Sequence, residues 1–230
     1  MTEAASRDEI CRIGRSLFER GYVHATAGNI SIRLDDGFLI TPTDACLGSL
    51  DPGQLARMDS SGVQISGDKA SKTILLHTRI YKAATAYQVD TRCVIHTHST
   101  HCVALTLNQP GHCALPETVL GKELLCAVTP YFVMKVGHVP LIPYHRPGAI
   151  EAADAVAAVI QRYGDANLPV RAVMLALLGP NVWHDSPSAA MATLEELEET
   201  AKLVLKNRTP VNALTEPQLN ELRQIFGAKW

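Results

Sequence analysis

Apolar positions along the chain recur at two spacings, one typical of amphipathic helices and one typical of strands. Near the start, Ile10, Leu17 and the apolar residues between them recur at helical spacing among charged residues, so a helix is predicted over residues 2–20. Similar stripes predict helices over residues 71–87, 150–163 and 186–206.

Between these stretches the pattern changes to an alternation of period two, which is typical of strands. Residues 28–41 alternate around an Asp-Asp-Gly turn and predict a β-hairpin, and residues 56–65 predict a second pairing. Short apolar runs predict further strands over residues 93–95, 131–136, 139–143 and 170–178. Because strands and helices mix without strict alternation or an internal repeat, residues 1–230 are expected to form one α/β domain with a mostly antiparallel or mixed sheet.

Composition narrows the classes of protein to which the chain can belong. Of 230 residues, 47% are apolar and the net charge is −2, so the chain can bury a large core but lacks the positive charge that attracts nucleic acid. The first residues carry charges rather than an apolar run, and no stretch reaches about 18 apolar residues, so neither a signal peptide nor a membrane partner is expected. The six cysteines form no C-x-x-C pair, which indicates reduced thiols and a cytoplasmic location.

The strongest local signal for chemistry is the sequence His96-Thr97-His98, which directly follows an apolar strand. Because residues two apart on a strand share a face, both imidazoles can reach one metal ion. His77 and His101 are further candidate ligands nearby in the sequence. The alternative interpretation is a pair of surface histidines at a strand end, without a metal.

Two polar segments are suited to binding an anion. In residues 28–31, glycine permits a tight turn, and Asn29 and Ser31 offer side-chain donors. In residues 67–72, Ser71 and Lys72 fall near the expected amino end of a helix, where anions are favoured. Each segment also has a plainer interpretation, because Gly-Asn begins many strands and Ser71 can serve simply as an N-cap.

Taken together and in order, these segments resemble the class II aldolase/adducin family over nearly the whole chain. The segments that carry the resemblance are GNIS at 28–31, TPTD at 41–44, GDKASK at 67–72, LLHTRIY at 75–81, HTHS at 96–99 and LLGP at 177–180. Within the family, the chain is most similar to the sugar-acid branch, the 3-oxo-tetronate 4-phosphate decarboxylases. That similarity is carried by CLGSLDP at 46–52, residues 130–148 and LEELEETAKL at 194–203.

The resemblance implies a class II aldolase-like three-layer α/β fold with a central, mostly antiparallel sheet flanked by helices. It also implies a homotetramer that acts on a small-molecule substrate and uses a divalent metal, with zinc favoured and manganese or iron as alternatives. His96 and His98 match the metal-binding pair of the family. The positions around the substrate's phosphate are matched by Asn29, Thr43, Ser71 and Lys72, with Asp44 beside them.

Three positions depart from the family pattern. Thr73 stands where an acidic residue is usual, and a threonine hydroxyl is a poor proton acceptor at neutral pH. Leu178 stands where a third histidine ligand is usual, so a third ligand has to come from elsewhere, with His145 and His184 as candidates. Asp44 replaces a glycine, and its carboxylate would repel a phosphate about 4 Å away by roughly 1 to 4 kcal/mol.

These features together predict a metal-dependent lyase, most simply a decarboxylase of a small 3-oxo sugar acid that acts through a metal-stabilised enediolate. One alternative is a divergent member with other metal chemistry, a decarboxylation or an oxidation, on an unphosphorylated acid. Another is a non-catalytic, adducin-like binding module that has lost the metal.

Three further features are expected to have plain roles. His138, between a glycine and a valine, is predicted to be an exposed hairpin residue. The acidic run at 195–199 is predicted to be the solvated face of a helix. For residues 224–230, one hypothesis is that they fold over a neighbouring subunit.

Overall fold

The structure, a computed structural model, describes residues 2–107, 116–207, 209 and 211–230. The predicted elements of the amino-terminal part are confirmed. They are α1 (Glu3–Glu19), the hairpin of β1 (Asn29–Leu34) with β2 (Gly37–Ile40), and the pair β3 (Ala56–Asp59) and β4 (Gln64–Ser66). Two short 3₁₀ turns, Leu47–Ser49 and Pro52–Gln54, connect β2 to β3.

The remaining elements follow in a mixed order of helices and strands. The middle of the chain forms α2 (Ile74–Ala84), β5 (Cys93–His96), α3 (Thr100–Leu105), β6 (Glu117–Thr118), β7 (Gly121–Lys122), α4 (Pro130–Lys135) and β8 (Leu141–Ile142). The carboxyl-terminal part forms α5 (Ile150–Asp165), β9 (Ala172–Leu175), β10 (Gly179–His184), α6 (Pro187–Lys206) and α7 (Glu216–Phe226).

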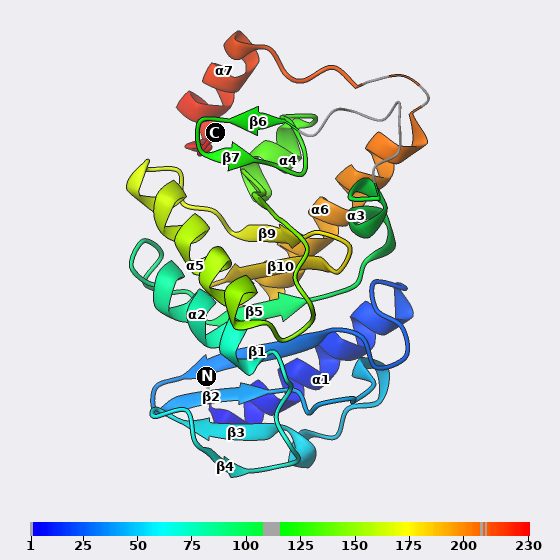
Figure 1. Ribbon diagram of the computed structural model, residues 1–230, viewed down its shortest axis with the longest axis vertical. Helices are drawn as coiled ribbons and strands as arrows, with labels where there is room; N and C mark the ends of the chain where they lie inside the picture. The colour runs from blue at the N-terminus through cyan, green and yellow to red at the C-terminus, as the bar shows by residue number, and fades with distance from the viewer. Residues whose placement is uncertain (1, 108–115, 208, 210) are drawn as a thin grey trace.

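Eight of the strands form one sheet in the order β4-β3-β2-β1-β5-β10-β9-β8 (Figure 1). Every neighbouring pair is antiparallel except β8 and β9, which are parallel. The expectation of a mostly antiparallel sheet is therefore confirmed. Strand β5 lies near the middle of the sheet, between β1 and β10, so its end is covered by neighbours on both sides.

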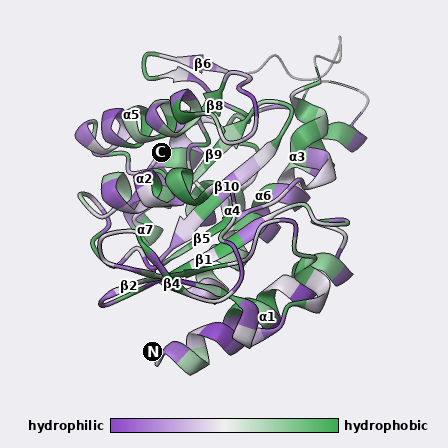
Figure 2. Ribbon diagram, turned by 60° about the horizontal axis from the view of Figure 1, so that its bottom comes forward, coloured by the Kyte–Doolittle hydropathy of each residue, from purple (hydrophilic) through white to green (hydrophobic). Residues whose placement is uncertain are grey.

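Helices cover both faces of the sheet and complete three layers. One apolar cluster joins α2 and α5 to one face through residues such as Ile80, Val156 and Trp183. Another joins α1 and α6 to the opposite face through residues such as Ile13, Ile95 and Leu197. Figure 2 shows apolar colour concentrated on the strands and hydrophilic colour on the outer sides of α1 and α5, as hydrophobic burial requires.

The prediction of a strand over residues 131–136 is wrong, because this segment lies in helix α4. Thr129 accepts a hydrogen bond from the backbone N–H of Phe132, and Pro130 occupies the first helical turn. An N-cap threonine followed by proline is a helix-start signal. It outweighs the strand preference of the β-branched and aromatic residues that follow it.

The apolar run at 170–178 is divided between a strand and a turn. Strand β9 ends at Leu175, and Leu177 adopts a left-handed backbone (φ 65°) that reverses the chain into β10. Strand β10 was not predicted, because its first residues include Gly179 and Pro180, which are unusual within strands. Leu178 therefore lies in the turn beside the end of β5, rather than within a strand.

Two of the residues expected at the surface are buried. His138 is 9% exposed, and its Nδ1 lies 2.9 Å from both carboxylate oxygens of buried Glu123. Glu198 is 2% exposed and accepts hydrogen bonds from the backbone N–H groups of His101 and Cys102 at the start of α3. In both cases a partner from a distant segment offsets the cost of burying a polar group.

The carboxyl-terminal residues fold back on their own chain. The Trp230 ring stacks on His138, with ring centroids 4.2 Å apart, and meets Phe132 edge-on at 5.8 Å. Among the described residues, no helix is long and apolar enough to cross a membrane. Cys93 and Cys102 are buried thiols, whereas Cys113 lies outside the described residues.

Candidate active site

Three neighbouring strands bring polar side chains together on one face of the sheet. Asn29 on β1 and Asn181 on β10 pair with His96, one on each side of the end of β5. Residues directly opposite each other on antiparallel strands point to the same face, and this face is the one covered by α2 and α5. The sheet thus places an imidazole between two amides beneath these helices.

Two glycines shape the backbone around the segment that follows His96. At Gly28 (φ 86°) a Cβ would lie 2.9 Å from the carbonyl oxygen of His96, and at Gly179 (φ 143°) it would overlap the carbonyl oxygen of Thr97. Neither approach is possible for a residue with a side chain, so both positions require glycine. The motifs at 28–31 and 177–180 therefore close on this segment from both sides.

His96 is buried and neutral. Burial, with a smaller contribution from His98, lowers the pKa of His96 to about 3. Its Nδ1 lies 3.0 Å from the carbonyl oxygen of Pro180, and because a carbonyl oxygen only accepts, Nδ1 carries the proton. Nε2 keeps its lone pair and has no hydrogen-bond partner among the described residues. This is the form in which an oriented histidine binds a metal.

His98 lies beside His96 although the strand ends at His96. The two ring centroids are 5.0 Å apart, and His24 approaches His98 from the loop before β1, at 6.5 Å. Burial, followed by the nearby His24, lowers the pKa of half-buried His98 below its usual value. The structure thus brings the two predicted metal ligands together and keeps both in the unprotonated form at neutral pH.

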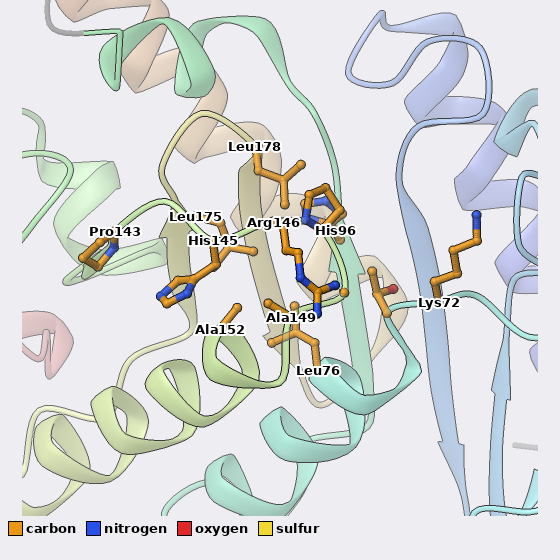
Figure 3. A pocket seen from close by; sticks show the side chains of 13 residues that line it. Lys72, Leu76, His96, Pro143, His145, Arg146, Ala149, Ala152, Leu175 and Leu178 are labelled. Atoms are coloured by element: carbon orange, nitrogen blue, oxygen red, sulfur yellow. The ribbon is translucent and has the colours of Figure 1, made fainter.

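His96 lines a pocket between the end of β5, the start of α2 and the turn that leads into α5 (Figure 3). The residues that line it are Lys72, Thr73, Leu76, His96, Pro143, His145, Arg146, Pro147, Gly148, Ala149, Ala152, Leu175 and Leu178. The pocket therefore contains both Thr73 and Leu178, the positions where an acidic residue and a third histidine were expected from the resemblance.

The lining of this pocket contains basic side chains and no aspartate or glutamate. Lys72, His145 and Arg146 contribute the basic groups besides His96, and leucine, alanine and proline side chains form most of the remaining wall. In Figure 3 the Arg146 guanidinium extends between His96 and Leu76, toward the centre of the pocket. A pocket of this charge favours an anionic ligand.

The two proposed sources of a third ligand do not join the histidine pair. His145 lines the same pocket, but in Figure 3 its ring points away from His96. His184 pairs with Cys93, three residues before His96 along β5, and its ring nitrogens contact Asp185 and Arg171. Within the described part of the chain, no group of three or more histidine, cysteine, aspartate or glutamate side chains is arranged to hold a metal.

The other two histidines considered as ligands have partners of their own. His101 Nδ1 lies 2.7 Å from a carboxylate oxygen of Glu198. His77 is fully buried on α2, with Nδ1 2.7 Å from the Ser31 hydroxyl and Nε2 2.6 Å from Oδ1 of Asn29. Since an amide oxygen only accepts, His77 donates from Nε2 to Asn29 and accepts from Ser31. The Asn29 amide nitrogen is thereby left to donate elsewhere.

The segment at 41–44 lies beside the predicted anion-binding segment at 67–72. Thr43 N–H donates to the carbonyl oxygen of Lys69 at 2.8 Å, and Ser71 N–H donates to that of Thr41 at 3.2 Å. Ser71 is not the N-cap of α2, because the helix begins at Ile74 after Thr73. Instead its hydroxyl lies 3.0 Å from that of Thr73 in the turn before the helix. The predicted phosphate-binding residues thus gather at one end of β1 and β2.

Asp44 adopts a left-handed backbone, with φ at 56°. This conformation explains why a glycine is usual at this position, because glycine adopts it without a steric penalty. The Asp44 carboxylate lies 3.6 Å from Nζ of Lys72, and both side chains are exposed. The pair keeps a negative charge next to the cation expected to meet a phosphate.

Sequence reasoning missed one residue of this region, Asn181. It is fully buried, and neither its amide oxygen nor its amide nitrogen has a hydrogen-bond partner among the described residues. The available signal was a single asparagine inside an otherwise apolar strand. Recognising it required the register with His96, which the sequence of β10 does not contain.

The residues present fit a divalent metal through two donors. The bare Nε2 of His96, the carbonyl oxygen that orients its ring, and the neighbouring neutral His98 are the features such a site requires. Leu178 offers no donor, so the remaining coordination positions would be left to water and substrate oxygens. Such an arrangement suits an open catalytic site better than a closed structural one.

The fold and these motifs define the class of protein. Residues 8–205 match the family model of the class II aldolase and adducin N-terminal domain, and the chain belongs to that family. It is 50% identical to a 3-oxo-tetronate 4-phosphate decarboxylase from Cupriavidus necator, over 100% of this chain and 99% of the relative. It is 39% identical to the decarboxylase of the same name from Escherichia coli strain K12, over 96% of each chain.

Solved structures agree with this assignment. YgbL from Escherichia coli, described as an aldolase, epimerase or decarboxylase, superposes with a TM-score of 0.81 at 37% identity and covers 96% of this chain and 99% of its own. An L-fuculose 1-phosphate aldolase superposes with a TM-score of 0.78 at 21% identity, over 99% of this chain and 98% of its own. The second likeness concerns the fold alone.

Proposed function

We propose that this protein is a divalent-metal-dependent carboxy-lyase that removes CO₂ from a 3-oxo-tetronate 4-phosphate. The observation that carries the proposal is the pocket at His96, which combines the open imidazole of His96, with His98 beside it, and basic groups, and has no carboxylate in its lining. The similarity to decarboxylases over the full chain supports it.

The absence of a carboxylate favours decarboxylation over aldol cleavage. Aldol cleavage begins when a base removes a hydroxyl proton, and Thr73 is a poor base at neutral pH. A 3-oxo acid needs no base. The bond between C1 and C2 breaks, CO₂ leaves, and the electron pair forms a C2–C3 double bond as the C3 oxygen becomes negative. A proton from water then reaches C2, and the three-carbon product is dihydroxyacetone phosphate.

We assign the metal to His96 and His98, with zinc as the first candidate and manganese or iron as alternatives. When bound, such a metal would withdraw electron density from the substrate's ketone oxygen. The chain's own contribution is to keep both imidazoles unprotonated and to hold the ring of His96 through the carbonyl oxygen of Pro180. Leu76, Leu175 and Leu178 form an apolar part of the wall beside it.

We assign the phosphate to the adjoining loops. Asn29 is oriented by His77 so that its amide nitrogen can donate, and Ser71 and Thr43 contribute hydroxyl groups beside it. Lys72 adds a cation that Asp44 partly neutralises. In this assignment the phosphate lies in the loops beside His96, and the 143–149 turn forms another part of the pocket wall.

The proposal is tested by metal analysis and a CO₂-release assay on protein purified without chelators. We expect a stoichiometric divalent metal, and formation of dihydroxyacetone phosphate from 3-oxo-tetronate 4-phosphate. The matched variant is His96→Ala/His98→Ala, which should lose both properties. Wild-type protein that carries no metal, accepts none and releases no CO₂ would refute the proposal.

A non-catalytic binding module is the second candidate, and Leu178 is the observation that favours it. A leucine at a ligand position weakens the metal site, because two imidazoles alone provide few of the donors that a metal needs. The variant Leu178→His discriminates between the two candidates. If the site is catalytic, the added donor should tighten metal binding and preserve turnover. In a non-catalytic binding module, the added donor would restore metal binding without turnover.

We further propose that residues 1–230 form one domain that assembles into a homotetramer in the cytoplasm. Buried thiols such as Cys93 and Cys102 are consistent with a reducing compartment. Light scattering of the purified protein at several concentrations tests the assembly, and a monomer throughout would contradict it.

A further inference from the structure

The cations of the pocket and of the neighbouring helix α2 differ in whether a carboxylate already neutralises them. Lys72 lies 3.6 Å from Asp44, and Arg79 on the outer side of α2 lies 3.1 Å from Asp154. Arg146, which lines the pocket, has no carboxylate partner within ion-pair distance among the described residues. Its charge is therefore available to a ligand.

Arg146 is exposed, and its side chain forms part of the pocket lining. The residue follows β8 in a turn that ends at Gly148, where the backbone is left-handed (φ 76°) and approaches the carbonyl oxygen of Lys72. This turn lies across the start of α2. In Figure 3 the guanidinium extends below His96 and above Leu76, in the middle of the pocket, whereas the Lys72 side chain stands at its edge. The site thus has one cation beside His96 and another at its margin.

A 3-oxo-tetronate 4-phosphate carries two anionic groups at its two ends, the phosphate on C4 and the carboxylate on C1. If the phosphate occupies the loops at Thr43 and Ser71, the carboxylate has to lie on the far side of the ketone. Arg146, whose guanidinium lies beside His96 in the pocket, is the cation available to meet it. A guanidinium matches a carboxylate with two parallel N–H donors, which fixes its orientation as well as its position.

We propose that Arg146 binds the C1 carboxylate of the substrate and thereby distinguishes the sugar acid from its decarboxylated product. This inference rests on the proposed function, because it takes the substrate class from it. The contact is made before the bond breaks and disappears when CO₂ leaves. It therefore contributes to substrate binding and to product release.

The inference is tested with two ligands that do not react. One is erythronate 4-phosphate, which has the carboxylate and the phosphate but a hydroxyl in place of the ketone. The other is dihydroxyacetone phosphate, which lacks the carboxylate. Calorimetric titration is carried out on wild type, Arg146→Gln and Arg146→Lys. The control is Arg15→Gln, which removes an exposed cation from α1 on the opposite face of the sheet.

We expect wild type to bind the carboxylated ligand more tightly, and Arg146→Gln to weaken that ligand about 10- to 100-fold while changing dihydroxyacetone phosphate less than threefold. Arg146→Lys should keep part of the difference, and Arg15→Gln should keep all of it. In turnover, the glutamine variant should raise KM far more than it lowers kcat.

Three results would overturn the inference: equal weakening of both ligands, no weakening of either, or failure of wild type to bind the carboxylated ligand. The outcome is separable from that of the proposed function, because both ligands are unreactive. A wild type that shows the binding difference but releases no CO₂ would refute the decarboxylase proposal and leave the carboxylate contact standing. Thermal unfolding of each variant checks that the exposed substitution leaves the fold intact.

Discussion

His77 on α2 and His96 on β5 are both fully buried histidines on the same side of the sheet, and they differ in what their second nitrogen meets. Burial lowers the pKa of each to about 3, so both are neutral at pH 7. Both nitrogens of His77 are bonded to side chains, Ser31 and Asn29. His96 bonds the carbonyl oxygen of Pro180 through Nδ1 and leaves Nε2 open beside the pocket.

The difference teaches how burial alone fails to identify a functional histidine. A buried polar group is stable when all its donors and acceptors are satisfied, which is the condition of His77. His96 keeps an unsatisfied nitrogen in the same environment, and an open lone pair there costs stability unless a ligand takes it. His77 is therefore expected to act on stability and on the orientation of Asn29, and His96 on chemistry.

The largest effect that this comparison predicts is the loss of turnover in His96→Ala. Removal of the open imidazole should lower kcat/KM for CO₂ release by about 10²- to 10³-fold, a range typical of the loss of one electrostatic group in a catalytic site. Steady-state assays beside urea unfolding measure both properties. A variant that unfolds more easily but turns over normally would show that the open nitrogen has no chemical role.

The next effect is a loss of stability in His77→Leu. The substitution removes the hydrogen bonds of His77 to the buried Asn29 amide and to the Ser31 hydroxyl, which keeps only Tyr81 as a partner. The free energy of unfolding should therefore fall by about 2 to 4 kcal/mol. Because Asn29 is no longer oriented, KM for the phosphorylated substrate should also rise. Retention of wild-type stability would mean that the bonds to Ser31 and Asn29 contribute little net free energy.

The pH dependence of stability sharpens the same comparison. For each histidine the folded pKa, about 3, lies below the unfolded value of about 6.5. The unfolded state therefore binds more protons in acid, and the stabilising contribution, complete above pH 6.5, is lost as the pH falls toward 3. The expected slope is about 1.4 kcal/mol per pH unit for each histidine.

Urea unfolding between pH 7 and pH 4 measures that slope in wild type and in His77→Leu. Between about pH 6 and pH 4, the slope of the unfolding free energy against pH should be smaller in the variant by the contribution of one histidine. Added divalent metal should stabilise both proteins, since it occupies His96 rather than His77. Identical slopes in the two proteins would contradict the lowered pKa of His77.

The smallest effect is expected at the edge of the site, in Asp44→Gly. Glycine relieves the left-handed backbone at this position and removes the carboxylate beside Lys72. We expect phosphate esters to bind up to about fivefold more tightly, and thermal stability to be unchanged or slightly raised, because each change amounts to about 1 kcal/mol at an exposed site. Lys72→Met is the matched variant and should weaken the same ligands.

Much of the fold follows from local pattern. Helix α1, the hairpin of β1 and β2, and the long helices α5 and α6 were predicted because their apolar spacing and turn residues act within a few positions. The helix α4 was mistaken for a strand because its six residues are too few to show a period, and only the Thr129 cap reveals its start. Strand β10 was not predicted because its first residues, Gly179 and Pro180, are unusual within strands.

The sequence by itself determined the family and the histidine pair. It also determined that Thr73 replaces an acid and that Leu178 replaces a metal ligand. Each of these follows from which residue stands at a given position in an ordered set of motifs. Only the tertiary structure decided which histidine nitrogens are hydrogen-bonded and which stay open. Ser31 and Asn29 bond both ring nitrogens of His77, Glu123 bonds Nδ1 of His138, and Asn181 and Arg146 lie near His96. These contacts join residues 15 to 85 positions apart. They depend on strand register and on packing between distant segments, and the local spacing of apolar residues contains no information about either.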